Sequence, residues 1–226
     1  MVKYHPDARF LTDFSAGTLP RAQALCVSAH LHYCAACRTR MRELTQLGSE
    51  LFLLQHPAAP SASAFDRLLG KIEVLPPHSS TDATPDYPQK NQPKREELPR
   101  AVAKLARGSL DNLSWQKIGR FFSYSRLPVS DAKHESSLLN IRAGSRVPHH
   151  RHVGDEITVI LKGSFSDSED NYGIGDFIVR TPGETHQPVA SQNEDCLCLV
   201  SLGAPIVMSN WLLRLLMPLI NRPRYG

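Results

Sequence analysis

The sequence predicts a multi-domain α + β protein, in which a small N-terminal helical bundle is joined by a proline-rich linker to a C-terminal β-barrel. Three observations carry this prediction. Apolar residues recur at intervals of three and four in residues 1–75, prolines crowd residues 76–100, and short apolar runs alternate with turn residues in 101–226. With 226 residues, the chain has room for two small domains.

Four amphipathic helices are expected in residues 1–75, because their apolar residues follow the helical period. Thr18 is the candidate N-cap of the second helix, and Pro20 suits its first turn. Four such helices in a short segment favour a compact bundle. The expected helices cover about residues 7–16, 18–33, 41–51 and 63–72.

Residues 76–100 hold six prolines and almost no large apolar side chains. Such a segment cannot bury enough apolar surface to offset the entropy of ordering its chain, so we read it as an extended linker. A flexible linker argues against a rigid relay between the domains on either side of it.

Residues 101–226 consist mostly of short apolar runs between clusters of Gly, Pro, Asp and Ser. This spacing predicts an all-β sandwich or a small barrel. The apolar stretch over residues 211–220 is too short to span a bilayer, and we expect it to pack on the barrel as a helix. The clearest strands are residues 138–141, 156–161, 176–179 and 196–200.

Composition excludes several classes of protein. The net charge is only +4 and the basic residues are dispersed, so direct nucleic-acid binding is not expected. The N-terminus lacks the apolar run of a signal peptide, and the cysteine count of five is odd. These features predict reduced thiols, a cytoplasmic location and no membrane partner.

A first group of candidate metal ligands follows the pattern His30-x3-Cys34-x2-Cys37. His30 and Cys34 share a helix face, and Cys37 follows across a turn, so three ligands converge at one corner. Thiolates with imidazole favour a structural zinc ion, which needs a fourth ligand. His5 is the best candidate for that ligand and His32 is its rival. A CxxC redox pair is the alternative reading.

A second group lies in residues 144–163, which match the first motif of the cupin family, Gly-x5-His-x-His-x3-Glu-x6-Gly. His150 and His152 point to one strand face, Glu156 follows across a turn, and His186 occupies the histidine position of a segment that resembles the second motif. The resemblance implies a jelly-roll barrel with a metal site. Three imidazoles and a carboxylate suit zinc, manganese, iron or nickel.

Cys196 and Cys198 alternate on one strand and share a face. They are more simply read as small apolar core residues. The alternative is a redox role near the metal, because two thiols beside metal-binding imidazoles are oxidisable groups close together.

The N-terminal residues resemble the zinc-binding anti-sigma domain family, through Gly17-Thr18-Leu19-Pro20 and the motif that begins at His30. Such a domain followed by a cupin is similar to the ChrR-type anti-sigma factors. The resemblance implies a non-enzymatic protein that inhibits an extracytoplasmic-function sigma factor and releases it under oxidative stress such as singlet oxygen, sensed by the cupin. It also allows a homodimer through the cupin.

Two other functions compete with this reading. Many metal cupins are oxygenases or isomerases, so a metal-dependent cupin enzyme is the main alternative. A DNA-binding regulator is the other, and Arg38, Arg40 and Arg42 are its only basic cluster in the helical region. We interpret those arginines as the solvated face of the third helix.

Overall fold

Contacts divide the chain into two units, one made of residues 1–45 with 93–226 and the other of residues 46–92. Because the predicted linker lies mostly outside the described residues, the boundaries predicted at residues 75 and 100 stay a prediction. The apolar stretch over residues 211–220 lies outside the described residues altogether. The computed structural model describes residues 2–56, 59–61, 63–73 and 97–208.

Helices α1 (Ala8–Ser15) and α2 (Arg21–Tyr33) lie where the periodicity placed them. The cap predicted for α2 is wrong, because the N-cap residue is Pro20 and makes no side-chain hydrogen bond. Thr18 instead closes the end of α1: its hydroxyl and its amide both donate to the carbonyl of Asp13, at 3.2 and 2.9 Å. The remaining helices are α3 (Ala35–Leu53), α4 (Ala64–Glu73), α5 (Arg100–Leu105) and a 3-10 turn (Leu110–Asn112).

Strands of the described residues form three antiparallel sheets. The largest has the order β1-β2-β3-β11-β5-β8, and the smaller two have the orders β10-β6-β7 and β12-β4-β9. Their bounds are β1 (Gln116–Ile118), β2 (Phe122–Ser130), β3 (Glu135–Ile141), β4 (His150–Arg151), β5 (Glu156–Lys162), β6 (Ser164–Ser166), β7 (Asn171–Gly173), β8 (Phe177–Arg180), β9 (Thr185–His186), β10 (Val189–Ala190), β11 (Cys196–Leu202) and β12 (Val207–Met208).

The C-terminal region is therefore β-structured as predicted, but its strands do not close into one hydrogen-bonded barrel within the described residues. Four of the strands in the small sheets are only two residues long.

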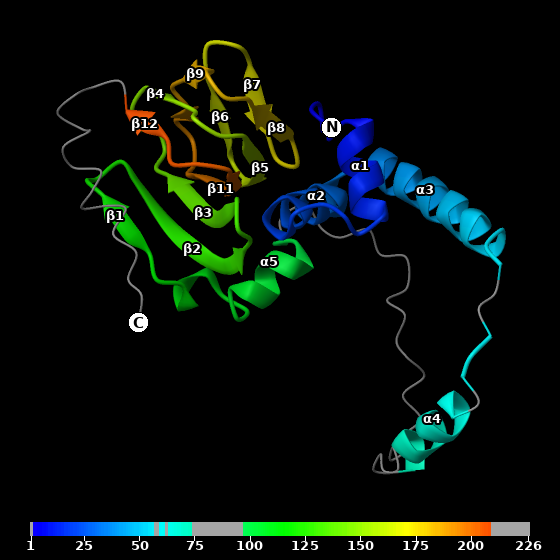
Figure 1. The fold of residues 1–226 in the computed structure, drawn as a ribbon. Helices are drawn as coiled ribbons and strands as arrows, with labels where there is room; N and C mark the ends of the chain where they lie inside the picture. Colours follow the sequence, from blue (N-terminus) through cyan, green and yellow to red (C-terminus); the bar gives the residue numbers. More distant parts are fainter. Residues whose placement is uncertain (1, 57–58, 62, 74–96, 209–226) are drawn as a thin grey trace. The chain divides into compact units, whose positions relative to one another are not determined.

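The central strands β5 and β11 of the six-stranded sheet are buried on both faces. Along β11, Leu197 and Leu199 face a core shared with α1, α2 and α5, whereas Cys196 and Cys198 face a second core among the strands. Side chains alternate along a strand, so a strand buried on both faces is apolar throughout. Figure 1 shows α2 lying between the sheet and α1.

The expectation that a linker rules out a rigid connection between the helical and β regions is wrong for residues 1–45. Helix α2 is buried on several sides, through residues such as Ala22, Cys26 and Val27. A helix that is apolar all round needs partners on more than one face, and here the sheet supplies one of them. None of the described helices is both long and apolar enough to cross a membrane.

Candidate metal centres

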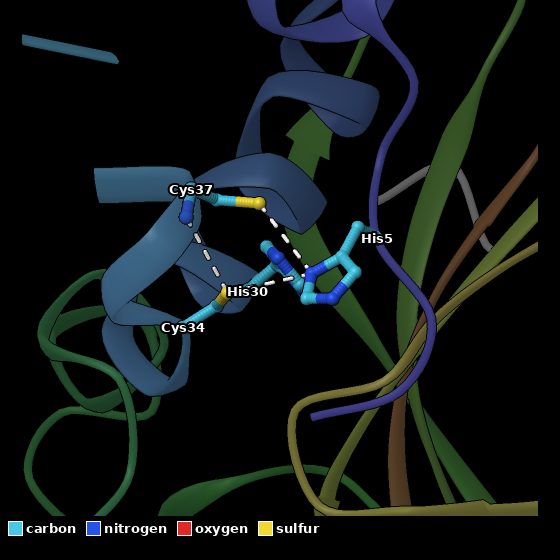
Figure 2. A group of neighbouring side chains, drawn as sticks. All are labelled: His5, His30, Cys34 and Cys37. Carbon is cyan, nitrogen blue, oxygen red and sulfur yellow. Dashed lines mark hydrogen bonds between the residues drawn. The ribbon is translucent and has the colours of Figure 1, made fainter. Parts of the chain in front are cut away.

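The first predicted site forms where the N-terminal arm meets the corner between α2 and α3 (Figure 2). His5 lies on the arm before α1, His30 in the last turn of α2, Cys34 at the junction and Cys37 in the first turn of α3. One ligand atom from each of the four lies within 4.8 Å of all the others. His32 lies outside this group, and its ring packs against Tyr33.

His5 presents Nδ1 to both sulfur atoms, at 3.4 Å from Sγ of Cys34 and 3.5 Å from Sγ of Cys37. The amide of Cys37 also donates to Sγ of Cys34. The two thiols and His30 are buried, whereas His5 is exposed. The site therefore has one solvent-facing ligand, which the arm can bring in or take away.

His30 is prepared to act as a ligand through one defined nitrogen. Its Nδ1 lies 2.7 Å from the carbonyl oxygen of Gly175, so this nitrogen is the donor. That tautomer leaves a lone pair on Nε2, a buried atom without a hydrogen-bond partner. Burial lowers the pKa of His30 to about 4, which keeps the ring neutral. A neutral imidazole held by an outer hydrogen bond is the usual state of a metal-binding histidine.

The thiols fit the same ion. Burial, helped by the hydrogen bond with Cys34, raises the pKa of Cys37 to about 12. A neutral thiol is a poor ligand, but a divalent cation replaces its proton and supplies the charge that stabilises thiolate. Two sulfurs and two imidazole nitrogens in a close group are a donor set that suits tetrahedral zinc.

The second predicted site forms between β4 and β9, two strands that pair at His150 and His186. These residues and His152 are buried, and their ligand atoms lie within 4.8 Å of one another. Their ring centroids are separated by 4.6 to 5.0 Å. The structure thus brings the three predicted histidines of the cupin motifs to one point.

The hydrogen bonds of this cluster leave ring nitrogens that could hold a cation. Nδ1 of His150 lies 2.9 Å from the carbonyl oxygen of Pro148, and Nδ1 of His186 lies 3.1 Å from Oδ2 of Asp167. Both rings therefore carry their proton on Nδ1, which leaves two Nε2 lone pairs facing each other at 3.0 Å. Burial lowers the pKa of His150 to about 4 and that of His152 to about 3. A metal ion between neutral imidazoles resolves the repulsion.

Glu156, the fourth predicted ligand, does not join this group of ligand atoms. Its Oε2 lies 3.6 Å from Nδ1 of His152, and its Oε1 accepts a hydrogen bond from Thr158 at 3.0 Å. Burial raises the pKa of Glu156 to about 7. The carboxyl group lies beside the ring of His152 and outside the group formed by the three histidines.

The sequence analysis missed Asp167, the partner of His186. Its side chain is fully buried and also pairs with Arg180, whose Nη2 lies 2.7 Å from Oδ2. Asp167 stands in an Asp-Ser-Glu-Asp turn that reads as solvated, so no local pattern marks it. His134 is half-buried, with Nε2 3.0 Å from Nε2 of Gln23 in α2.

Cys196 and Cys198 are fully buried in the second core, as the apolar reading predicts, and their Sγ atoms lie 3.6 Å apart. A register shift in the pairing of β11 with β5 falls between Leu197 and Cys198. The hydrogen bond with Cys196 and burial raise the pKa of Cys198. Both thiols are therefore close together and shielded from solvent.

Comparison with known proteins agrees with this architecture. The ChrR cupin-like domain family matches residues 104–205. The chain is 31% identical over 220 residues to the anti-sigma-E factor ChrR of Cereibacter sphaeroides, and the alignment covers 96% of this chain and 97% of that protein. The solved structure of Rhodobacter sphaeroides SigE in complex with the anti-sigma ChrR matches with a TM-score of 0.73 and 28% identity, over 89% of this chain and 100% of that one. Similarity over nearly the whole length shows that the chain belongs to the ChrR family of anti-sigma factors.

Proposed function

We propose that this anti-sigma factor binds an extracytoplasmic-function sigma factor through its N-terminal region and releases it when the cupin-like region is oxidised, as by singlet oxygen. The observation that carries the proposal is full-length similarity to an anti-sigma factor, including one solved with its sigma factor. The same similarity makes the chain a regulator rather than a metal-dependent cupin enzyme. A homodimer through the cupin stays a prediction.

The docking surface in this proposal is the apolar face of α4. Phe65, Leu68, Leu69 and Ile72 recur at helical spacing, and each is between 40% and 66% exposed. Apolar side chains at these intervals form the stripe by which an amphipathic helix enters a groove of a partner. Large apolar residues at the end of α3, such as Phe52 and Leu53, are also exposed. A soluble partner that covers these side chains removes them from water.

In this proposal a structural zinc ion binds His5, His30, Cys34 and Cys37. Bound there, zinc would supply a cross-link between the arm, α2 and α3, which are short elements with little core of their own. The cupin-like site would hold zinc, manganese, iron or nickel on His150, His152 and His186, with Glu156 in support. The neutral imidazoles suit each of these ions.

In this proposal, the groups that are oxidised are the thiols of Cys196 and Cys198 in the buried second core. Two thiols 3.6 Å apart can close to a disulfide by losing two electrons and two protons, which singlet oxygen accepts to become hydrogen peroxide. The new bond would shorten the distance between the sulfurs and displace β11, because a disulfide has a sulfur–sulfur distance of about 2 Å. If Cys196 and Cys198 serve only as core, their replacement leaves the oxidant response unchanged.

Sigma-factor binding tests the first half of the proposal. We expect Phe65→Asp with Leu69→Asp to weaken binding of the cognate sigma factor about thirtyfold or more, since buried apolar anchors dominate such interfaces. Arg67→Ala with Lys71→Ala, on the opposite face of the same helix, is the matched control and should change affinity less than threefold. Capture of partners from the native host, followed by titration with the purified sigma factor, measures both. No sigma factor among the captured proteins would contradict the proposal.

The sensor half has a separate test. We expect His150→Ala with His186→Ala to abolish the further release of the sigma factor that singlet oxygen causes. Release is measured as sigma-dependent transcription before and after illumination with a photosensitiser. A normal response in this variant would remove the cupin-like site from sensing and leave the anti-sigma function untouched.

A further inference from the structure

One segment of the cupin-like region contacts both candidate metal centres. It runs from the β6–β7 turn to the start of β8, residues 167–177, and we call it the link segment. Its first residue is hydrogen-bonded to a histidine of the cupin-like cluster. Its last residues are hydrogen-bonded to the end of α2 and to residues 2–7, which we call the N-terminal arm. Figure 1 shows the N-terminal end of the chain beside β7 and β8.

At the cupin-like end, Asp167 fixes His186. The carboxylate lies 3.1 Å from Nδ1 of that ring, has no exposed side-chain surface and is held in turn by Arg180. The buried carboxylate cannot replace this contact with one to water, so a displacement of His186 would also displace the backbone of the turn.

The turn itself is closed by its own hydrogen bonds. The amide of Asp167 donates to the carbonyl of Asp170 at 3.1 Å, and the amide of Asp170 donates back to Oδ1 of Asp167 at 3.3 Å. The carboxylate of Asp170 leaves the turn on the other side and accepts hydrogen bonds from the hydroxyl of Tyr4 and the ammonium of Lys3. Asp167, whose carboxylate contacts His186, and Asp170, whose carboxylate contacts the arm, therefore lie in the same hydrogen-bonded turn.

At the other end, the link segment positions two zinc ligands. The amides of Lys3 and Tyr4 donate to Oδ1 of Asp176 at 2.6 and 3.0 Å, and the carbonyl of Tyr4 accepts from the amide of Phe177 at 3.1 Å. His5 is the next residue of the arm, so its backbone position depends on these bonds. The carbonyl of Gly175 binds Nδ1 of His30 directly.

We propose that the link segment couples the two metal centres, with Asp167 as the positioning residue of His186 and with Tyr4 and Gly175 as those of His5 and His30. This inference rests on the proposed function, since it gives the path by which damage at the cupin-like cluster would loosen the zinc corner that holds α2 and α3. His150 belongs to the same cluster, but its Nδ1 bonds to Pro148, two residues away, and it has no bond to the link segment among the described contacts.

This difference supplies the experiment. His186→Gln and His150→Gln are introduced separately into the full chain, and each disables the cupin-like cluster. The rate of amide hydrogen exchange at residues 2–5 reports how firmly the arm is held. Cobalt in place of zinc reports the first site, because in our assignment only Cys34 and Cys37 give a thiolate-to-cobalt charge-transfer absorption. The decay of this absorption after a chelator is added gives the rate of cobalt loss.

We expect His186→Gln to speed arm exchange and cobalt loss about tenfold, the size of effect that outer ligand contacts have on metal affinity, and His150→Gln to change both less than twofold. Tyr4→Phe alone should speed arm exchange and cobalt loss. Adding His186→Gln to Tyr4→Phe should then have no further effect, because contacts on one path are not additive. Protection of the β11 amides confirms folding, and Asp167→Asn replaces His186→Gln where that variant does not fold.

Equal effects of the two histidine variants, or none from either, would overturn the coupling. A wild type without the thiolate absorption would overturn it together with the zinc assignment. Sigma-factor binding enters neither measurement, so loss of the coupling is distinguishable from failure of the proposed function.

Discussion

At the scale of single residues, the buried histidines of both sites share one device. Each of His30, His150 and His186 gives Nδ1 to a fixed oxygen and keeps Nε2 for the cluster. The oxygen selects the tautomer and the ring orientation, so affinity for a metal depends on residues that never touch it.

Asp167→Asn tests this device at the cupin-like site. An amide is a weaker acceptor than a carboxylate, so we expect metal affinity there to fall about 10- to 100-fold. Residual metal per chain at graded chelator concentrations measures it. Asp195→Asn is the control, because Asp195 also accepts two hydrogen bonds, from Ala143 and Asn140, but at a surface turn. A similar loss in both variants would mean that Asp167 acts through general stability.

A comparison of His5→Gln with His32→Gln tests which histidine is the fourth ligand of the first site. The sequence left both histidines open, and the geometry brings Nδ1 of His5 to both sulfurs. We expect His5→Gln to lower bound zinc by close to one ion per chain under mild chelation, and His32→Gln to retain it. Elemental analysis of the purified variants measures the difference, and the reverse result would exchange the two roles.

At the scale of elements, the turn between β7 and β8 is shaped to receive α2 and the arm. Gly175 has a φ of +89°, and a Cβ there would lie 2.6 Å from Cβ of Tyr33 and 2.8 Å from Cγ2 of Val2. The turn therefore needs glycine both for its backbone conformation and for the close approach.

Gly175→Ala and Gly183→Ala separate these two needs. Gly183 has a similar φ of +98°, but a Cβ added there would meet nothing within 4 Å among the described residues. Both variants carry backbone strain of about 1–2 kcal/mol. We expect Gly175→Ala to lose about 1–3 kcal/mol more in urea unfolding, from overpacking against α2. Equal losses would show that this contact contributes little to stability.

At the scale of the whole molecule, the N-terminal helices and the sheet share one core. Leu199, which is fully buried, faces α2 from β11, and Leu25 and Val27 face it from the helix. Two regions joined by such a core unfold together, although they are separated in the chain by a proline-rich segment.

Leu199→Ala should therefore destabilise both regions at once. We expect a cost of about 2–5 kcal/mol, as for other buried leucines cut to alanine. The loss should coincide in far-ultraviolet circular dichroism and in the fluorescence of Trp115, which packs beside this core. Val179→Ala, at a side chain 37% exposed, is the control and should cost less than about 1 kcal/mol. Separate transitions for helices and sheet would contradict a single cooperative unit.

Much of the site could be predicted because its ligands lie close together in the sequence. His30, Cys34 and Cys37 span two helical turns and one junction, and His150 and His152 share a strand face, so local geometry brings them together. The boundaries of α1 and α2 followed from apolar periodicity in the same way. Thr18 was misassigned because a cap for α2 and a closing residue for α1 have the same local pattern.

By itself, the sequence determined the two groups of candidate ligands, the helical and β regions, and the resemblance to ChrR-type anti-sigma factors. Tertiary structure alone decided that α2 packs on the sheet, that Glu156 lies beside His152, and that Asp167 and Gly175 hold the ligands. The physical reason is the separation along the sequence of the residues that come into contact. Ligand spacing and periodicity are local, whereas contacts such as His30 to Gly175 join residues far apart in the chain, and only the packed core brings them together.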